Sequence, residues 1–164
     1  MPKPKKVNRS GLDPATTAAW AISRLDGRST DRLTRLVRTD PDPNLRRMAA
    51  YALGHIRNKR AETALREVLG DRAQPSAVRG MAAEHLAASF AWDAVPDLIT
   101  GLGDPEPEVR FWCAYGMGFM RVRSALPRLR RLAAGDYARV PGWWTVKREA
   151  RWAIEQIAQG PWER

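Results

Sequence analysis

The sequence predicts an all-α fold, a right-handed α-solenoid of about five stacked helical hairpins. Three observations predict it: four segments of the 164-residue chain align with one another, apolar residues recur within each segment at helical spacing, and prolines and aspartates mark the segment ends. A repeated unit of this kind is typical of a solenoid, in which each hairpin buries its apolar face against its neighbours.

A basic residue near the start of each copy sets the register of the repeat. These residues are Arg46, Arg79, Arg110 and Lys147. They follow one another in steps of 33, 31 and 37 residues, and the long last step contains an insertion, residues 137–144. A weaker fifth copy begins at Ala15, so the repeats fill most of the chain.

The first helix of each unit is predicted from three columns of apolar residues. One position before the basic residue stand Leu45, Val78, Val109 and Val146. Three positions after it stand small residues: Ala18, Ala49, Ala82, Cys113 and Ala150. Seven positions after it stand Ile22, Leu53, Leu86, Met117 and Ile154. Spacings of four residues, at about 100° per residue, place these columns on one helical face.

The second helix of each unit also has helical apolar spacing. Its apolar sets are Leu33/Leu36/Val37, Leu65/Val68/Leu69, Val95/Leu98/Ile99/Leu102 and Leu126/Leu129/Leu132. Prolines stand just ahead of the next first helix, where the first-turn N–H groups have no helical partner to lose. These prolines are Pro43, Pro75 and Pro107.

These patterns divide the chain into a disordered basic N-terminal arm, residues 1–11, and a repeat domain, residues 12–160. The expected units are about 12–40, 41–71, 72–104, 105–136 and 137–160. The arm contains Lys3, Lys5, Lys6 and Arg9. It is interrupted by proline and poor in apolar residues, which favours a solvated arm or a phosphate-binding one over a packed segment.

The pattern Pro-x-Val-Arg-x-x-Ala-Ala-x-x-Leu-Gly resembles the HEAT-like repeat, in the bacterial form that also occurs in phycobilisome lyases. The residues that carry the resemblance are Pro43–Gly54, Pro75–Ala87 and Pro107–Gly118. The resemblance implies a solenoid that scaffolds and binds. It also implies a structural ladder between repeats, in which turn aspartates meet the register arginines. The ladder residues are Asp40, Asp71 and Asp104 with Arg46, Arg79 and Arg110.

The net charge of +10 favours acidic partners, either a protein or a nucleic acid. The charge is unevenly distributed, because residues 1–60 carry 14 Lys and Arg against 5 Asp and Glu. Residues 61–120 carry 4 against 9, and residues 121–164 carry 10 against 4. The chain is therefore basic at both ends and acidic in the middle, which argues against an uninterrupted nucleic-acid track.

The expected location is the cytoplasm. The single cysteine, Cys113, excludes an intramolecular disulfide, and the N-terminus lacks the apolar stretch of a secretory signal. Because no apolar run approaches the roughly 20 residues that span a bilayer, we expect no membrane insertion.

The sequence favours a binding module over an enzyme, and no cofactor is expected. Metal ligation needs clustered His, Cys, Asp or Glu, but His55, His85 and Cys113 fall in three different units. One HEAT-like enzyme family, deoxyhypusine hydroxylase, uses repeated His-Glu pairs for iron, whereas this chain has a single reversed pair, Glu84-His85. DNA alkyl-base glycosylases share the solenoid, but their aligned Trp and Asp set is missing here.

One first helix has a second apolar stripe, which is a candidate binding site. Phe111, Tyr115 and Phe119 follow at spacings of four and point away from the core face. A helix that is apolar all round is normally buried all round, so something must cover this stripe. The cover is either the chain's own insertion, through Trp143 and Trp144, or a partner or second copy in a homodimer.

The second helices contribute basic residues to the expected concave face. Those assigned to partner binding are Arg35, Arg66, Arg128 and Arg131. The leading hypothesis is a non-catalytic scaffold or adaptor solenoid that binds an acidic or amphipathic protein element. The alternative is a nucleic-acid-binding solenoid that acts through phosphate contacts.

Overall fold

The computed structural model describes residues 27–56 and 58–160, so the N-terminal arm and most of the first unit lie outside the described residues. Within them the predicted all-α solenoid is confirmed, with eight α-helices, two short 3-10 helices and no strand. The elements are α2 Gly27–Thr39, α3 Pro43–His55, α4 Lys59–Gly70, α5 Ser76–Ala88, η1 Trp92–Ala94, α6 Val95–Gly101, α7 Pro107–Phe119, η2 Arg123–Ala125, α8 Leu126–Gly135 and α9 Val146–Ala158. None of the described helices is long and apolar enough to cross a membrane.

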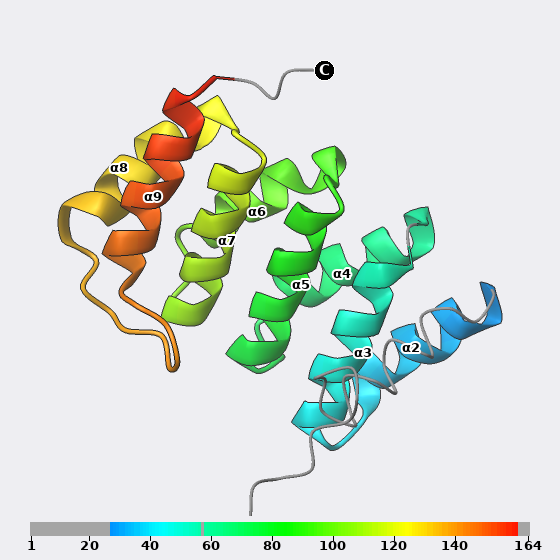
Figure 1. Ribbon diagram of the computed structural model, residues 1–164. Helices are drawn as coiled ribbons and strands as arrows, with labels where there is room; N and C mark the ends of the chain where they lie inside the picture. Colours follow the sequence, from blue (N-terminus) through cyan, green and yellow to red (C-terminus); the bar gives the residue numbers. More distant parts are fainter. Residues whose placement is uncertain (1–26, 57, 161–164) are drawn as a thin grey trace, which may run out of the picture.

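The helices form two layers (Figure 1). The odd-numbered helices α3, α5, α7 and α9 stand side by side in one layer, and each packs on the next. The even-numbered helices α2, α4, α6 and α8 form the layer behind them, and each packs on the odd-numbered helix that follows. Each helix therefore buries one face against the other layer and its flanks against neighbouring units.

The core lies between the layers and is lined by the predicted columns. The small column is buried throughout, at Ala49, Ala82, Cys113 and Ala150. Leu53, Leu86 and Met117 of the larger column are also buried, whereas Ile154 is half-buried. The first-turn column is buried at Val78, Val109 and Val146, but Leu45 is 51% exposed.

Polar side chains and prolines define where the helices begin. Asp42, Asn58 and Thr145 each accept a hydrogen bond from a backbone N–H in the first turn of the helix they precede. Pro43 and Pro107 occupy the first positions of α3 and α7, as the sequence predicted. Because a first-turn N–H has no helical acceptor, these prolines fix the helix start without removing a bond.

Two first-layer helices end in an unusual backbone conformation. After α5, the N–H of Ala91 donates to the carbonyl of Leu86 at 2.9 Å, and after α7 the N–H of Val122 donates to Met117 at 2.9 Å. This closure needs a residue with positive φ, which is usually glycine. Here the positions hold Phe90, with φ of 53°, and Arg121, with φ of 56°. A left-handed conformation costs an L-residue roughly 1–2 kcal/mol.

The register arginines join consecutive units. The Arg79 guanidinium is 5% exposed, donates to the carbonyl of Leu69 at 3.0 Å and forms a two-pronged ion pair with Asp104. Arg110 repeats the arrangement: it donates to the carbonyl of Asp104 at 2.8 Å and to the carboxylate of Asp136 at 2.7 Å. Each arginine therefore holds the turn before its helix and the turn that closes its own unit.

This arrangement corrects the expected ladder pairs. An arginine meets the carboxylate that ends its own unit, so Asp40 is not the partner of Arg46 and instead accepts a hydrogen bond from the N–H of Asp42. Arg46 donates to Gln74 at 2.9 Å instead of to Asp71. Asp71 instead accepts a hydrogen bond from the N–H of Ala73, as Asp104 does from the N–H of Glu106.

Candidate interaction surface

The outer stripe of α7 is covered unevenly. Phe111, at the beginning of the helix, is only 1% exposed, whereas Tyr115 and Phe119 are partly exposed. The cover over Phe111 is the segment between α8 and α9, residues 137–145, which we call the strap (Figure 1). Val140 and Val146 are buried against Phe111, and the rings of Trp143 and Phe111 have centroids 5.8 Å apart.

A few backbone hydrogen bonds fold the strap back on itself. The N–H of Val140 donates to Trp144 at 3.4 Å, and the N–H of Val146 donates to Ala138 at 3.0 Å. The reversal uses Gly142, whose φ of 80° is accessible at little cost only to glycine. The strap is therefore a short hairpin-like loop.

A buried carboxyl group lies beneath the strap. Glu149 on α9 is 2% exposed, and its Oε2 accepts a hydrogen bond of 2.6 Å from the indole N–H of Trp144. Burial raises the pKa of Glu149 to about 7, although the indole and the nearby Arg148 both act to lower it. The guanidinium of Arg148 lies 4.8 Å from the centroid of the Trp144 ring.

The rest of the stripe belongs to a chain of aromatic rings. Tyr115 stacks on Trp152 of α9, with centroids 5.6 Å apart, and on Phe119 at 5.7 Å. Phe119 contacts Phe90, in the turn after α5, at 5.2 Å. Phe90 is 39% exposed and its neighbour Trp92 is 57% exposed. Aromatic contacts therefore run from the turn after α5 across α7 to α9 and the strap.

We call this set the aromatic surface; its members are Phe90, Trp92, Trp112, Tyr115, Phe119, Trp143, Trp144 and Trp152. The sequence indicated only Phe111, Tyr115, Phe119, Trp143 and Trp144, and of these Phe111 is not accessible. Trp152 had a signal, because it stands at the same repeat position as Tyr115. Phe90 and Trp92 lie between helices and belong to no repeat column, so only the folded arrangement reveals them.

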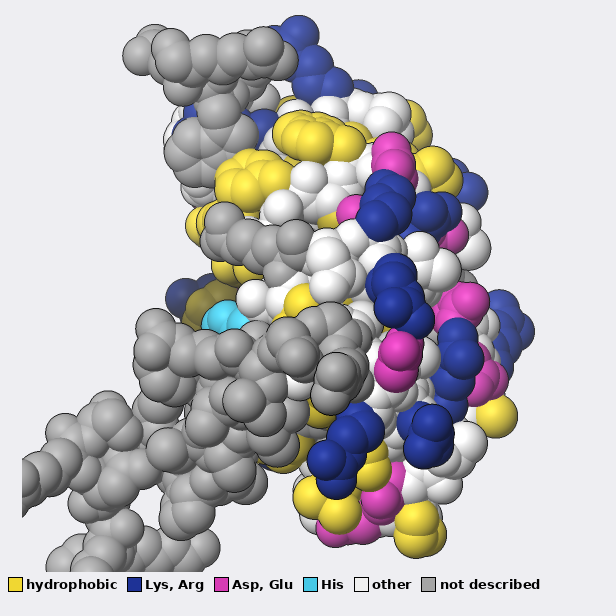
Figure 2. Space-filling model, turned by 90° about the vertical axis from the view of Figure 1, so that its right-hand side faces the viewer, with side chains coloured by type: hydrophobic (Ala, Val, Ile, Leu, Met, Phe, Trp, Pro, Cys, Tyr) yellow, Lys and Arg dark blue, Asp and Glu magenta, His cyan; other side chains and the backbone are white. Residues whose placement is uncertain are grey.

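The basic residues of the second layer are largely committed to contacts between units. Arg66 pairs with Asp97, with Nε 2.6 Å from Oδ2, and Arg128 donates to the carbonyl of Ile99 at 2.7 Å. Arg38 pairs with Glu67 in the same way. Figure 2 shows Lys and Arg side chains interspersed with Asp and Glu down one side of the molecule. Of the four arginines assigned to partner binding, Arg35 and Arg131 remain exposed without an ion pair to a described residue.

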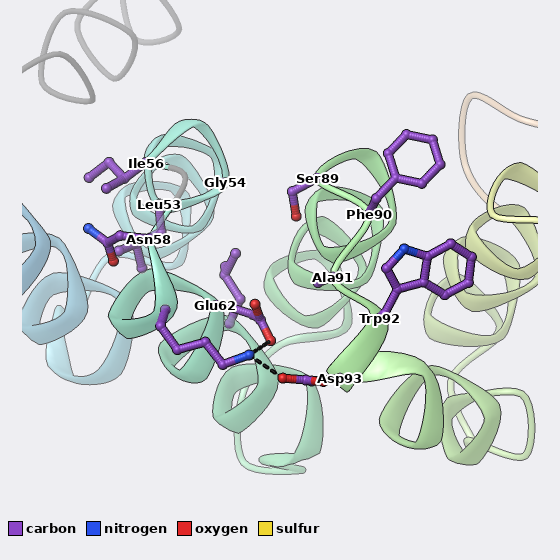
Figure 3. A pocket seen from close by; sticks show the side chains of 12 residues that line it. Leu53, Gly54, Ile56, Asn58, Glu62, Ser89, Phe90, Ala91, Trp92 and Asp93 are labelled. Atoms are coloured by element: carbon purple, nitrogen blue, oxygen red, sulfur yellow. Dashed lines mark hydrogen bonds and ion pairs between the residues drawn. The ribbon is translucent and has the colours of Figure 1, made fainter. Parts of the chain in front are cut away.

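A hollow of about 370 Å³ lies where the turn between α3 and α4 faces the turn between α5 and η1 (Figure 3). Lys59 is one of the residues that line it, and it donates to Glu62 at 2.9 Å and pairs with Asp93. Phe90 and Trp92 point outward from its rim. The hollow therefore adjoins the aromatic surface, but its charged groups are already paired with one another.

The histidines form an aromatic cluster instead of a metal site. The rings of His55 and His85 lie 5.2 Å apart, and both contact Tyr51. Burial lowers the pKa of His85 to about 4, so this imidazole is neutral near pH 7. The described residues contain no group of three or more His, Cys, Asp and Glu side chains that could hold a metal ion. Burial likewise raises the pKa of the Cys113 thiol, which makes it a poor nucleophile.

These features define a helical-repeat protein with an outward-facing aromatic surface. The model of HEAT repeats matches residues 14–76 and 71–155, and the chain therefore belongs to the HEAT repeat family. No curated protein matches it.

One similar solved structure is that of human deoxyhypusine hydroxylase in complex with glycerol, with a TM-score of 0.65 and 24% sequence identity. The match covers 83% of this chain but 46% of that one, so the chain spans less than half the length of the hydroxylase. A likeness at this level of identity shows the fold alone.

Proposed function

We propose that the protein is a non-catalytic scaffold that binds an acidic or amphipathic protein segment on its aromatic surface. The observation that carries the proposal is Phe90, a 39% exposed phenylalanine held in the left-handed conformation beside Trp92. Positive φ is a genuine outlier for a bulky residue, and such strain is concentrated at functional sites. The equivalent turn after α7 holds Arg121 in the same conformation, so the feature particular to the turn after α5 is the exposed ring beside Trp92.

The chemistry of the surface fits a partner with apolar anchors. Tryptophan and tyrosine rings are enriched among the residues that dominate binding energy, because each buries a large apolar area with little loss of side-chain freedom. The exposed rings Trp92 and Trp143 lie toward opposite ends of the chain of aromatic contacts. One extended or helical segment that spans them can bury both.

The surroundings favour acidic groups on that partner. Arg139 in the strap and Arg148 and Arg151 on α9 are exposed. By contrast, the carboxyl of Glu149 on the same helix is buried and half-protonated near pH 7. A cationic edge beside aromatic rings attracts carboxylates and increases the rate of association. The positive net charge would also suit a nucleic-acid-binding solenoid. In the second layer, however, the Lys and Arg side chains are interspersed with Asp and Glu (Figure 2).

The test is capture from native lysate by three versions of the chain: the wild type, the double variant Trp92→Ser with Phe119→Ser, and the control Leu45→Ser. Leu45 is 51% exposed on α3, outside the aromatic surface, so its loss removes a similar apolar group elsewhere. Capture is measured at about 50 and 300 mM salt, with and without nuclease, a range over which phosphate contacts are largely lost.

We expect a specific protein that is retained by the wild type and by Leu45→Ser but lost from the double variant. Because Phe119 also packs against the main core, capture is compared at a temperature where circular dichroism shows all three versions folded. Capture that disappears with nuclease assigns the chain to nucleic acid instead. Equal capture by all three versions overturns the aromatic surface as the binding site. Light scattering on the purified chain shows whether a second copy is the partner.

A further inference from the structure

The strap builds a small core of its own. Phe111, Val140 and Val146 form a buried cluster distinct from the main core between the helix layers, with Ala138 and Leu132 packed beside it. The outer side of the strap faces solvent, because Trp143 is 47% exposed and Trp144 is 37% exposed. Val140 is the buried residue that the strap itself adds to this cluster, so lifting the strap uncovers Phe111 while the buried residues of the main core keep their contacts with one another.

Glu149 is the polar group that this cover removes from water. It forms no ion pair with any described residue, and its hydrogen bond to the Trp144 indole ties the strap to α9. The other groups that face it are Arg148 on its own helix and Tyr115 on α7. Glu84 on α5 also acts on Tyr115, and the side chains that act on the pKa of Glu149 are Trp144 and Arg148.

An ionised Glu149 is costly while the strap is closed. A carboxylate out of water needs a paired cation or several donors, and here one indole N–H is the hydrogen-bond donor it has. That bond favours the ionised form, yet burial outweighs it and raises the pKa to about 7. Lifting the strap lets water reach the carboxylate and removes the cost.

We propose that the strap is a proton-controlled cover, which lies on Phe111 while Glu149 is protonated and opens more often when Glu149 ionises, adding the Phe111 ring to the aromatic surface. The value of the added ring rests on the proposed function, but the opening itself does not. The strap thereby regulates how much apolar area a partner can reach near neutral pH.

The sign follows from proton linkage. The closed state binds the Glu149 proton more tightly than an open state in which the carboxyl has its ordinary pKa of 4.5. Raising the pH from below 4.5 therefore favours opening until the group is ionised in both states, at about pH 8. Between about pH 5.5 and about pH 8, the ratio of open to closed strap rises about 30-fold.

Hydrogen exchange of the strap amides, measured on the full chain without partner, tests the cover. The informative groups are the N–H groups of Val140 and Val146, whose hydrogen bonds close the strap. The control is Glu149→Gln, which keeps an acceptor for the indole but cannot ionise. Because intrinsic exchange depends on pH equally in both proteins, only the ratio of their rates is read.

We expect the exchange rate of the strap amides in the wild type, divided by the rate in Glu149→Gln, to rise about 30-fold between about pH 5.5 and about pH 8. Amides in the middle of α5 should show no such rise, which separates local opening from unfolding of the whole chain. A ratio that stays constant at the strap, or that rises equally in α5, overturns the proposal.

If Glu149→Gln fails to fold, the strap-to-α5 ratio of exchange rates within the wild type gives the same answer. A second variant, Trp144→Phe, removes the indole donor while keeping a ring, and should speed strap exchange at every pH. Unchanged strap exchange in Trp144→Phe argues that the indole does not hold the cover. These results are independent of the capture experiment, so either proposal can fail without the other.

Discussion

Helices α3 and α7 use the same repeat positions on their outer faces for different chemistry. One, five and nine positions after the register arginine, α7 carries Phe111, Tyr115 and Phe119. The same positions on α3 hold Arg47, Tyr51 and His55. On α3 the stripe meets His85 of the next helix, whereas on α7 it meets Trp152 of the next helix and the strap.

The difference teaches that each outer stripe is covered locally, by the side chains that the next unit supplies. In both places a titratable group becomes buried in the process, His85 beside α3 and Glu149 beside α7. Burial disfavours the charged form of either group, so it lowers the pKa of the imidazole and raises that of the carboxyl. One backbone arrangement therefore gives two pH responses of opposite sign.

The largest expected difference in stability between variants of α3 and α7 lies at the first stripe position. Phe111→Ala removes a fully buried ring from under the strap, and we expect the free energy of unfolding to fall by about 3–5 kcal/mol. Arg47→Ala, at the matching position of α3, should change it by less than about 0.5 kcal/mol. Urea unfolding followed by circular dichroism measures both. Equal effects would show that the strap does not bury Phe111 in solution.

The two buried titratable groups should also make stability depend on pH in opposite directions. The pKa of His85 falls from 6.5 to about 4 on folding, so its contribution to stability is complete above pH 6.5 and is lost as the pH falls through about 4. The loss approaches about 3 kcal/mol. His85→Phe keeps a ring against Tyr51 but cannot titrate. It should therefore flatten the acid limb of the stability curve, which is the fall in unfolding free energy as the pH decreases from 6.5 to about 4.

The measurement is the difference in unfolding free energy between the wild type and His85→Phe across that pH range, because the carboxylates common to both proteins then cancel. Glu149→Gln serves as the matched control. It should leave the acid limb of His85 in place and remove only the loss of stability that sets in between about pH 4.5 and 7. An identical acid limb in His85→Phe contradicts the burial of the neutral imidazole.

The smallest expected difference lies at two equivalent glycines, Gly54 on α3 and Gly118 on α7. A Cβ at Gly118 would come within 2.6 Å of the Ala153 Cα, and at Gly54 it would come closer still to the His85 Cβ. The backbone of the neighbouring helix fixes both atoms, so we expect Gly118→Ala and Gly54→Ala each to cost about 2 kcal/mol.

The control is Gly135→Ala at the end of α8, where a Cβ meets nothing within 4 Å. Alanine there should be neutral or stabilising by up to about 1 kcal/mol, since it is the better helix former. Thermal unfolding of the three variants suffices. A loss at Gly54 or Gly118 as small as the change at Gly135 would mean that the neighbouring helix shifts to make room for the added methyl group.

The fold was predictable because the same residue types recur at the same positions of each repeat. The small column at Ala49, Ala82 and Cys113 reports how closely the helices approach, and it recurs often enough to be read without coordinates. Leu45 shows the limit, since its column is buried in every later copy yet Leu45 itself is exposed. A column records what a position usually does, whereas burial also depends on which neighbouring helix is present.

The site was predictable only in part, because its members come from different structural contexts. The stripe on α7 is visible as a spacing, and the tryptophans of the insertion are near it in sequence. Phe90 and Trp92 reach it by folding from the preceding unit, at positions that no column contains. The ladder forms with partners other than the expected ones: Arg79 meets Asp104 and Arg110 meets Asp136. Arg46 meets Gln74, and no spacing rule anticipates that side chain.

The bridging arginines have a consequence for how the molecule comes apart. Arg79 and Arg110 each pair with the carboxylate that ends their own unit and donate to a backbone carbonyl of the unit before it. Loss of the preceding unit would therefore leave each guanidinium without that carbonyl acceptor. In a linear array, stability is a sum of unit energies and nearest-neighbour couplings. These carbonyl bonds add to the couplings, so the array should melt in a single cooperative step and shortened versions should lose more than their share of the stability.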